Sequence, residues 1–326
     1  MSSDNTGKDT RILRADAAAI AEAAGVLRAG GLAAFPTETV YGLGARADDP
    51  RAVASLYAAK GRPSFNPLIA HVRGLDVAKR LGNFSEAALT LAEKFWPGPL
   101  TLVVKASGNE CACELARAGL DTIAIRVPSH EIAQALLASV DFPVVAPSAN
   151  RSGHVSPTAA QHVAEDLTGK IDLILDGGPS KGGIESTIVD FSSDAPRLLR
   201  RGGIARGEIE KITGPLLHAA KSEISAPGMM ASHYAPHAKL RLDAKEVREN
   251  EALLAFGTSP PEGSHRARKI LNLSMRGDLA EAASNLYAYL RELDASGAEA
   301  IAAAPIPGEG LGEAIRDRLS RAAAPK

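Results

Sequence analysis

Short apolar runs typical of buried strands alternate along this chain with apolar positions at helical spacing. Residues 32–35 form an apolar run that predicts a strand, and the strand ends at Pro36 because proline cannot donate a ladder hydrogen bond. Asp49 and Pro50 are typical of an N-cap and a first helical turn, and Gly61 of a C-terminal stop. The pattern therefore predicts a strand and then a helix.

Further elements are predicted up to residue 213. Gly42 and Gly44 indicate a turn or a close approach of the backbone to a ligand. Residues 1–10 are expected to be disordered, and residues 106–120 to form a loop with a short helix. Strands are predicted at 67–72, 100–105, 122–127, 143–146, 171–176, 186–190 and 197–200. Helices are predicted at 17–29, 86–95, 129–140 and 158–167, with Asp16 and Ser85 as N-caps of the first two.

The pattern changes at Lys239. Strands at 239–242, 252–257, 269–273 and 300–305 alternate with helices near 277–295 and 312–323. This alternation predicts a small Rossmann-like parallel α/β domain whose sheet is covered on both faces. We expect an α/β protein with a twisted mixed-sheet domain at 11–213, a linker or lid at 214–238, and the smaller domain at 239–326.

Composition narrows the function classes. The 326 residues include 45% apolar residues, and the net charge of −1 gives no global basic field for nonspecific nucleic-acid binding. Cys111 and Cys113 form a single C-x-C, too few ligands for a zinc site. The polar N-terminus has no signal-peptide core, and no apolar run reaches ~18 residues, so a soluble cytoplasmic protein without a membrane span is expected.

Cations at element ends are the candidate phosphate ligands. The P-loop pattern G-x-x-x-x-G-K-[ST] is missing, and the glycines at 42 and 44 fit the dinucleotide fingerprint only loosely. Each cation alone is more often a solvated surface charge, but small polar residues stand beside all of them. Guanidinium forks suit phosphate oxygens, and an ammonium acts as a point charge. The candidates are Lys60, Arg62, Arg126 and Arg200.

The polar uncharged candidates have equally plain structural interpretations. Ser148 and Asn150 follow a predicted strand, where ligands gather in α/β sheets, but the pair alone favours a cap or an Asx turn. His71 lies in an apolar strand, where a satisfied core histidine is the default. His233 and His237 are four residues apart, but Pro236 between them disfavours the helix that a zinc pair would need.

Several long motifs, in a fixed order along the chain, favour a functional interpretation of these residues over the plain structural one. The segments are PTETVYGLG at 36–44, KGRPSFNPLIAHV at 60–72, TIAIRVP at 122–128, APSANRSGHVSPT at 146–158 and ESTIVD at 185–190. Together they resemble the YrdC-type domain of threonylcarbamoyl-AMP synthases. APGMMASHYAP at 226–236 resembles the linker of the two-domain branch of that family. The resemblance runs from about Ala17 to Ile204, with the linker in addition.

The resemblance implies an enzyme that converts ATP, L-threonine and bicarbonate to threonylcarbamoyl-AMP, pyrophosphate and water. It assigns L-threonine to Thr39, His71, Arg126 and Ser186. It assigns ATP to Lys60, Arg62, Asn66, Thr122, Ser148, Asn150, Ser156, Arg200 and Tyr234, with Thr37 and Tyr41 lining the pocket. It implies positioning and charge stabilisation by Lys60 and Arg62 instead of a protein nucleophile. Mg²⁺ is expected to arrive with ATP, without a metal site on the protein.

The resemblance also implies partners. The product would pass to a tRNA threonylcarbamoyl transferase, while direct contact with tRNA stays open. Met229, Met230, His233 and Tyr234 in the linker predict that residues 227–236 fold over the pocket as a lid. One alternative is a carbamoyl transferase of the hydrogenase-maturation type, against which two cysteines argue. Another is a non-enzymatic RNA-binding module, whose affinity would fall steeply with salt.

Overall fold

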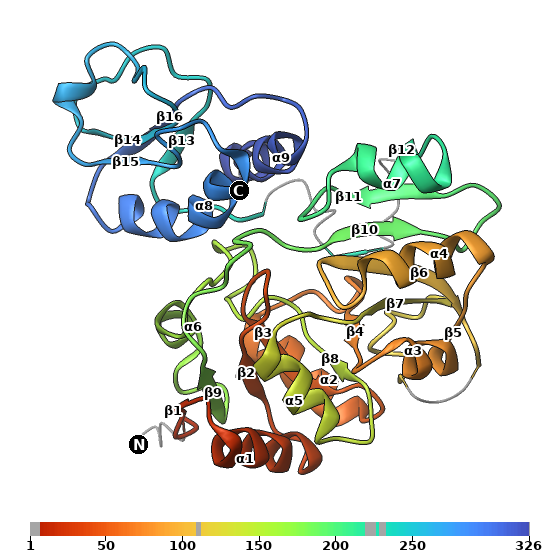
Figure 1. Ribbon diagram of the computed structural model, residues 1–326. Helices are drawn as coiled ribbons and strands as arrows, with labels where there is room; N and C mark the ends of the chain where they lie inside the picture. Colours follow the sequence, from red (N-terminus) through yellow and green to blue (C-terminus); the bar gives the residue numbers. More distant parts are fainter. Residues whose placement is uncertain (1–6, 109–111, 219–225, 228–232, 326) are drawn as a thin grey trace.

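The protein consists of two α/β domains that lie side by side (Figure 1). The computed structural model describes residues 7–108, 112–218, 226–227 and 233–325. Among these residues, twelve strands of the first domain join one mixed sheet in the order β1-β9-β2-β3-β8-β4-β7-β6-β10-β11-β12, with β5 against β6. The strands are β1 (Arg11–Arg14), β2 (Ala33–Phe35), β3 (Gly42–Arg46), β4 (Ile69–His71), β5 (Gly82–Asn83), β6 (Leu100–Ala106), β7 (Thr122–Arg126), β8 (Val144–Val145), β9 (Leu173–Asp176), β10 (Thr187–Asp190), β11 (Arg197–Arg200) and β12 (Leu217–His218).

Helices cover both faces of this sheet. On β2, Ala34 packs in the cluster that contains α2, whereas Ala33 and Phe35 pack in the cluster that contains α1 and α5. This alternation follows from the two-residue period of a strand. The helices are α1 (Ala17–Arg28), α2 (Pro50–Lys60), α3 (Leu75–Leu81), α4 (Glu86–Phe95), α5 (Glu131–Ala138), α6 (Ala160–Leu167) and α7 (Arg206–Thr213).

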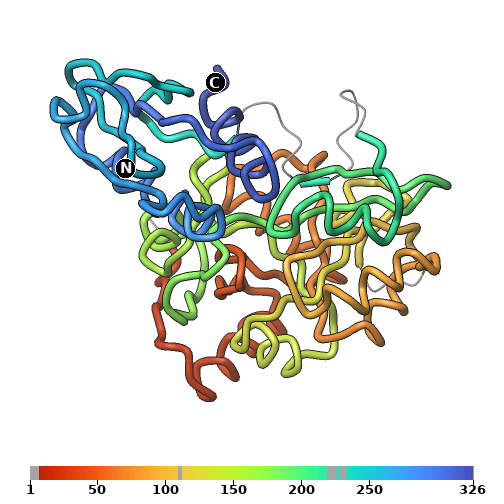
Figure 2. Tube along the Cα trace, turned by 45° about the horizontal axis from the view of Figure 1, so that its top comes forward, coloured from red at the N-terminus to blue at the C-terminus, as the bar shows by residue number. Residues whose placement is uncertain are grey.

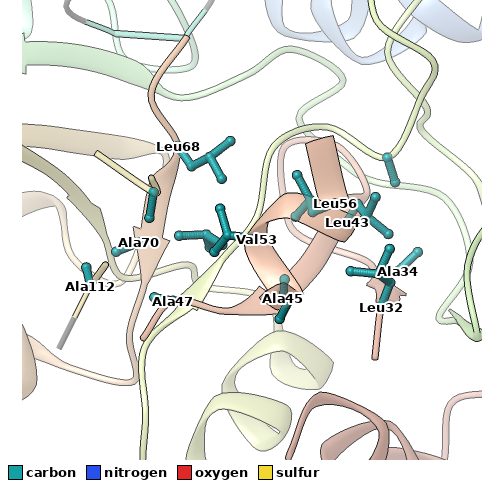
Figure 3. Packing of buried hydrophobic residues seen from close by; sticks show 14 of the residues in the cluster. Leu32, Ala34, Leu43, Ala45, Ala47, Val53, Leu56, Leu68, Ala70 and Ala112 are labelled. Atoms are coloured by element: carbon teal, nitrogen blue, oxygen red, sulfur yellow. The ribbon is translucent and has the colours of Figure 1, made fainter. Parts of the chain in front are cut away.

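Helix α2 forms as its sequence predicts. The Asp49 carboxylate accepts from the backbone N–H of Arg51, and Gly61 ends the helix with φ of +60°. Val53 and Leu56 point from α2 into the core, and Figure 3 shows Leu56 beside Leu43 of β3. This packing fixes the position at which the chain leaves the helix towards Arg62.

The glycine-rich stretch after β2 differs from the prediction. Gly42 and Gly44 lie in strand β3, antiparallel to β2, so the predicted turn is wrong. The close approach that the structure shows at Gly44 is to protein, and the expected approach to a ligand stays a prediction. A Cβ on Gly44 would lie 3.0 Å from the Ala33 carbonyl oxygen and 3.0 Å from Phe35 Cε1. Glycine therefore allows β2 and β3 to pack closely here.

Three elements have no clear sequence signal. Strand β1 pairs in parallel with β9, but most of its residues are exposed, so it lacks an apolar alternation. Helix α3 has seven residues and no side-chain cap. Strand β12 has two residues, both exposed, on the edge of the sheet. Pairing with a neighbouring strand defines the two strands more than their own residues do.

The second domain has the predicted parallel sheet. Its described strands are β13 (Lys239–Arg241), β14 (Glu251–Ala255), β15 (Ile270–Asn272) and β16 (Ala300–Ala303), in the order β13-β16-β14-β15. All their pairings are parallel. The helices are α8 (Leu279–Asp294) and α9 (Leu311–Ala323), with a short 3₁₀ helix η1 (Ser264–Arg266). Helices α8 and α9 lie on the side that faces the first domain, as Figure 2 shows from a second direction.

Some sequence predictions concern residues beyond the described part of the chain. These are the expected disorder of residues 1–6 and the roles of Cys111, Met229 and Met230. Of the predicted linker, the structure describes residues 214–218, 226–227 and 233–238. No helix within the described ranges is long and apolar enough to cross a bilayer.

Candidate active site

A small cavity lies where strand ends of the first sheet meet the linker. Its volume is about 40 Å³. It is lined by Thr39, Val40, Arg62, Ile69, His71, Arg126, Ala146, Pro147, Ser148, Glu185, Ser186, Arg200, Pro227, His233 and Tyr234. A larger groove of about 570 Å³ runs between α1, α3 and α5. We place the site in the smaller cavity because the polar side chains singled out by the sequence converge there.

Eight of the thirteen predicted site residues line this cavity: Thr39, Arg62, His71, Arg126, Ser148, Ser186, Arg200 and Tyr234. Sheet register explains much of this convergence. Strands β4 and β7 are parallel neighbours, and His71 at the end of β4 is the register partner of Arg126 at the end of β7. The carboxyl ends of parallel strands meet at one edge of a sheet, which is where ligands bind in α/β folds.

Arg126 is oriented by a carboxylate that the predicted set omits. Its Nη2 donates to Glu38 Oε1 at 2.6 Å, and its Nε donates to the Gly98 carbonyl at 3.3 Å. The other Glu38 oxygen accepts from the Ser129 backbone N–H at 3.1 Å. Burial alone would raise the pKa of Glu38, but Arg126 and these hydrogen bonds lower it. Glu38 is therefore an anion that fixes the guanidinium at the cavity wall.

His71 is neutral and presents an acceptor. Burial, with a smaller contribution from Arg126, lowers its pKa to about 3. Its Nδ1 lies 3.0 Å from the Ile69 carbonyl oxygen. A carbonyl can only accept, so Nδ1 carries the proton and Nε2 is left with a lone pair. Such a nitrogen can accept a hydrogen bond from a hydroxyl or an ammonium group.

The hydroxyl groups of Thr39 and Ser186 line the cavity, whereas Thr37 and Tyr41, which the sequence predicts in the lining, lie outside it. Thr37 Oγ1 lies 2.8 Å from Thr39 Oγ1 and donates to the Val40 carbonyl at 2.6 Å, so it accepts from Thr39. Ser186 Oγ lies 2.7 Å from Thr101 Oγ1 on β6. The four residues in these two hydroxyl pairs are buried. Their hydrogen bonds to one another hold the hydroxyls in defined orientations before any ligand arrives.

Two further buried guanidinium groups, those of Arg62 and Arg200, also line the cavity. Arg62 donates to the carbonyls of Asn66 and Pro67, and Arg200 donates to Ser186 and to the Pro227 carbonyl. Burial lowers the pKa of Arg62 to about 10, and the nearby charge of Arg200 contributes. Burial also lowers the pKa of Arg200. Two desolvated like charges destabilise each other, and an entering polyanion would relieve that cost.

Lys60 has a different place from the one predicted. Its Nζ donates to the Ser148 carbonyl at 2.5 Å and to the Asn150 carbonyl, so it fastens the loop after β8. Burial, together with the charge of Arg62, holds its pKa well below the usual lysine value. Lys60 itself does not line the cavity. The structure therefore shows a support for the loop that carries Ser148.

Four other predicted residues also lie outside the lining. Asn66, Asn150 and Ser156 are buried close to it, and the Asn150 amide donates to the His154 carbonyl at 2.7 Å. Thr122 begins strand β7, four residues before Arg126, which is about 13 Å away along an extended chain. The structure does not bring Thr122 to the cavity, because this residue pairs with Lys105 at the far end of the strand.

Two carboxylates beside the cavity are missing from the predicted set. Glu185 precedes Ser186, and burial alone would raise its pKa, but Arg318 and Arg200 lower the pKa to about 2. Glu38 is the second. The sequence signal that could have identified both carboxylates is their position, since Glu38 lies between Thr37 and Thr39 and Glu185 directly precedes Ser186. Their partners lie 88 and 133 residues away in the chain, so spacing could not identify those partners.

The linker contributes Pro227, His233 and Tyr234 to the lining. Burial lowers the pKa of His233 to about 3. The rings of His233 and Tyr234 lie 4.0 Å apart, and Tyr234 stacks on Tyr287 of α8 at 5.6 Å. Tyr234 therefore lines the cavity, and its predicted contact with ATP stays a prediction. Ring contacts with the second domain hold this part of the linker at the cavity.

The chain is similar to known proteins over both of its domains. The family model described as "Telomere recombination" (Sua5_yciO_yrdC) matches residues 25–202, and the model described as "Threonylcarbamoyl-AMP synthase, C-terminal domain" matches residues 204–324. The threonylcarbamoyl-AMP synthase of Pyrococcus abyssi is 44% identical over 323 residues, which are 92% of this chain and 92% of that protein. The chain belongs to the threonylcarbamoyl-AMP synthase family.

A second relative and a solved structure agree over most of the chain. The Bacillus subtilis threonylcarbamoyl-AMP synthase is 41% identical and covers 93% of this chain and 92% of its own. The crystal structure of P. abyssi Sua5 complexed with L-threonine superposes with a TM-score of 0.87 at 38% identity, covering 96% of both chains. Both domains of this chain thus follow the family fold.

Proposed function

We propose that this protein is an L-threonylcarbamoyladenylate synthase, which converts ATP, L-threonine and bicarbonate to threonylcarbamoyl-AMP, pyrophosphate and water. The observation that carries the proposal is the pairing of two ligand environments in one cavity. Arg62 and Arg200 form a buried cationic end, while Arg126 and His71 form an end for a small amino acid. Activation of an amino acid derivative with ATP requires these two environments to adjoin.

We assign L-threonine to the end that contains Arg126. The guanidinium of Arg126 would pair with the substrate carboxylate as a charge-assisted fork. The lone pair on His71 Nε2 would accept from the substrate hydroxyl or ammonium, and Thr39 and Ser186 would complete the hydrogen bonds. A site with oriented acceptors for a hydroxyl discriminates strongly against an analogue that lacks the hydroxyl.

We assign the nucleotide to the end that contains Arg62 and Arg200, with Ser148 and Tyr234 beside it. Lys60, Asn66, Asn150 and Ser156 would support this wall from behind. Among the described residues, no group of three or more His, Cys, Asp or Glu side chains could hold a metal ion. In this proposal Mg²⁺ enters as part of the substrate MgATP.

The reactants themselves supply the nucleophile in this reaction. The amine of L-threonine and bicarbonate form a carbamate with loss of water. A carbamate oxygen then attacks the α-phosphorus of ATP and displaces pyrophosphate. The protein has to align the carbamate with the phosphorus and balance negative charge, which are the tasks that oriented donors and buried guanidinium groups perform.

The linker is the proposed lid. A nucleotide and an amino acid need a pocket of roughly 300–1,000 Å³, whereas the cavity measures about 40 Å³. Pro227, His233 and Tyr234 close one side of it. We expect residues 227–236 to open for substrate entry and to fold over the pocket once substrates are bound, while residues 239–326 anchor the far end. Closure would keep water from the mixed anhydride product.

The product would be consumed by a tRNA threonylcarbamoyl transferase in the cytoplasm. Whole-length similarity to threonylcarbamoyl-AMP synthases does not favour a carbamoyl transferase of the hydrogenase-maturation type or a non-enzymatic RNA-binding module. Nothing in the cavity requires tRNA to take part in the adenylation step.

The test is pyrophosphate release with MgATP, bicarbonate and L-threonine, each omitted in turn. We expect release only with all three present, together with a product of the mass of threonylcarbamoyl-AMP. L-Valine replaces the threonine hydroxyl with a methyl group and is the matched control. Equal release with L-valine would refute the assignment of the amino acid. Release without bicarbonate would refute the carbamate route.

A further inference from the structure

Side chains of the second domain donate hydrogen bonds to a carboxylate of the first domain, Glu185, at the cavity wall. Glu185 is 5% exposed, precedes Ser186 and lines the cavity. Its carboxylate accepts from Ser156 Oγ at 2.6 Å within the first domain. It also accepts from Tyr287 Oη at 2.9 Å and from Arg318 Nε at 2.8 Å, both from the second domain. Two of its three side-chain donors therefore come from α8 and α9.

Arg318 does more than balance this charge. Its side chain is fully buried, with an exposed fraction of 0%, but it does not line the cavity. Its Nη2 donates to the Arg201 carbonyl at 2.8 Å, and its Nη1 donates to Asp317 at 2.7 Å. Its guanidinium carbon lies 5.1 Å from the centre of the Tyr234 ring. One fork thus joins the segment before β10, the segment after β11 and the linker.

These segments carry two of the candidate ligand groups. Ser186 follows Glu185, and Arg200 precedes Arg201. Arg200 also donates to Ser186 Oγ at 3.0 Å and to the Ser186 carbonyl at 3.1 Å. A displacement of either segment would alter both ligand groups together. Shifts of about 1 Å at such positions cost about 100-fold in rate, even when the change is remote from the reacting atoms.

We propose that Arg318 is a positioning residue for the synthase reaction, which holds Ser186 and Arg200 in register from the second domain without contacting substrate. This inference rests on the proposed function and adds a task for the second domain. The geometry explains why an arginine is used. A planar guanidinium can donate to a carboxylate and to a backbone carbonyl at fixed angles, whereas the ammonium of lysine acts as a single point.

Three full-length variants test the proposal. Arg318→Lys keeps a buried cation opposite Glu185 but loses the fork, and Arg318→Gln removes the charge. Arg316→Gln is the matched control, since Arg316 is exposed on the same helix. We expect Arg318→Lys to stay folded with a somewhat lower melting temperature, because the Arg201 carbonyl loses its donor, and to lose at least about tenfold in kcat/KM for L-threonine. Arg316→Gln should match the wild type in both.

A double-mutant cycle with Ser186→Ala separates positioning from general stability. If Arg318 acts through Ser186, the losses in kcat/KM from Ser186→Ala and Arg318→Lys will combine to less than their product. Independent losses would refute the inference, as would a folded Arg318→Lys enzyme within about twofold of the wild-type kcat/KM, since a tenfold loss is what a broken fork predicts. If Arg318→Gln fails to fold, Arg318→Lys decides the outcome.

The same experiment distinguishes this inference from the proposed function. If the wild-type enzyme makes threonylcarbamoyl-AMP and the Arg318→Lys variant is fully active, the positioning role is refuted and the synthase function stands. A wild-type enzyme that makes no such product would remove both.

Discussion

Burial determines the charge states of the residues at the cavity, and those charge states determine what can bind there. His71 and His233 are both neutral because desolvation lowers the pKa of each to about 3. Arg62 and Arg200 keep their charges despite burial, since even a pKa of about 10 leaves Arg62 protonated near neutral pH. The cavity therefore combines neutral acceptors with fixed cations.

The neutral histidines predict a pH dependence of folding stability. The pKa of His71 falls from its ordinary 6.5 to about 3 on folding, so the unfolded chain takes up a proton first as the pH falls. The stabilisation is therefore complete above pH 6.5 and is lost progressively down to the folded pKa. Each such histidine contributes a slope of up to about 1.4 kcal/mol per pH unit in this window. His130, His162 and His233 shift in the same direction.

Urea unfolding at about pH 7 and about pH 5 measures this slope, in a range where unfolded carboxylates are still mostly ionised. We expect His71→Gln to show a smaller loss of unfolding free energy between these two pH values than the wild type. An unchanged difference would contradict a neutral, desolvated His71.

Lys60 and Arg62 stand two residues apart and should respond differently to substitution. Lys60→Ala leaves the buried Ser148 and Asn150 carbonyls without their donor, which should cost roughly 1–3 kcal/mol of stability. Arg62→Ala removes a charge that lines the cavity and should lower kcat/KM for ATP at least about tenfold, because a charge-assisted hydrogen bond contributes roughly 1.5–3 kcal/mol. Thermal melting and steady-state kinetics compare the two variants. A Lys60→Ala variant that melts at the wild-type temperature would contradict the loop-supporting role of Lys60.

At the scale of elements, strand ends and the turns beside them position the ligand groups. Strands β10 and β11 are antiparallel, and a register shift between Ile188 and Val189 brings Arg200 opposite Ile188. The turn that follows β11 packs directly against the start of β10, and the Gly203 N–H donates to the Glu185 carbonyl at 3.0 Å. The two ends thus form one unit around Ser186.

Gly202 tests this unit. A Cβ at this position would meet the Glu185 carbonyl oxygen and would lie 2.5 Å from the Ser186 carbonyl oxygen. The atoms in the way belong to the backbone of Glu185 and Ser186, which can move only at a large cost in free energy. Gly202→Ala should therefore displace Ser186 and weaken L-threonine binding at least about tenfold. Gly207→Ala is the control, since Gly207 is exposed on α7 and a Cβ there would have nothing within 4 Å. Calorimetric titration with L-threonine measures both variants. Equal affinities would show that Ser186 is not held by this turn.

At the scale of the whole molecule, the two domains share one apolar cluster. Val40, Val155 and Ile184 of the first domain pack with residues of α8 and α9, among them Leu286 and Leu290. Polar contacts flank the cluster, including a hydrogen bond of 2.6 Å from Arg291 to the Val155 carbonyl. This interface places Tyr287 and Arg318 behind the cavity, so domain docking and site geometry are coupled.

Gly183 tests the coupling. It is buried with φ of +69°, and a Cβ would meet the Ala283 carbonyl oxygen and lie 2.6 Å from the Ser284 carbonyl oxygen on α8. Gly183→Ala should displace α8 and lower synthesis of threonylcarbamoyl-AMP at least about tenfold. Gly178→Ala is matched in backbone strain, since Gly178 has φ of +77° and a Cβ there would have no atom within 4 Å. Pyrophosphate release and limited proteolysis compare the two. Equal activity of both variants would contradict the coupling.

The sequence by itself determined the elements with strong local signals. The capped helix α2, the strand–helix alternation of the second domain, and most of the cavity-lining residues followed from periodicity, capping residues and ordered motifs. Helix periodicity and caps depend on neighbours three or four residues away, which a sequence displays directly.

Tertiary structure alone decided the rest. Gly42 and Gly44 form strand β3 and not a turn because β2 packs closely against them. Strand β1 likewise forms because it pairs with β9. Contacts between residues 88 to 133 positions apart decide two further points. They determine whether Lys60 binds a ligand or a loop, and which arginine neutralises Glu185. Such contacts follow from strand order and domain docking, which neither periodicity nor a local motif encodes.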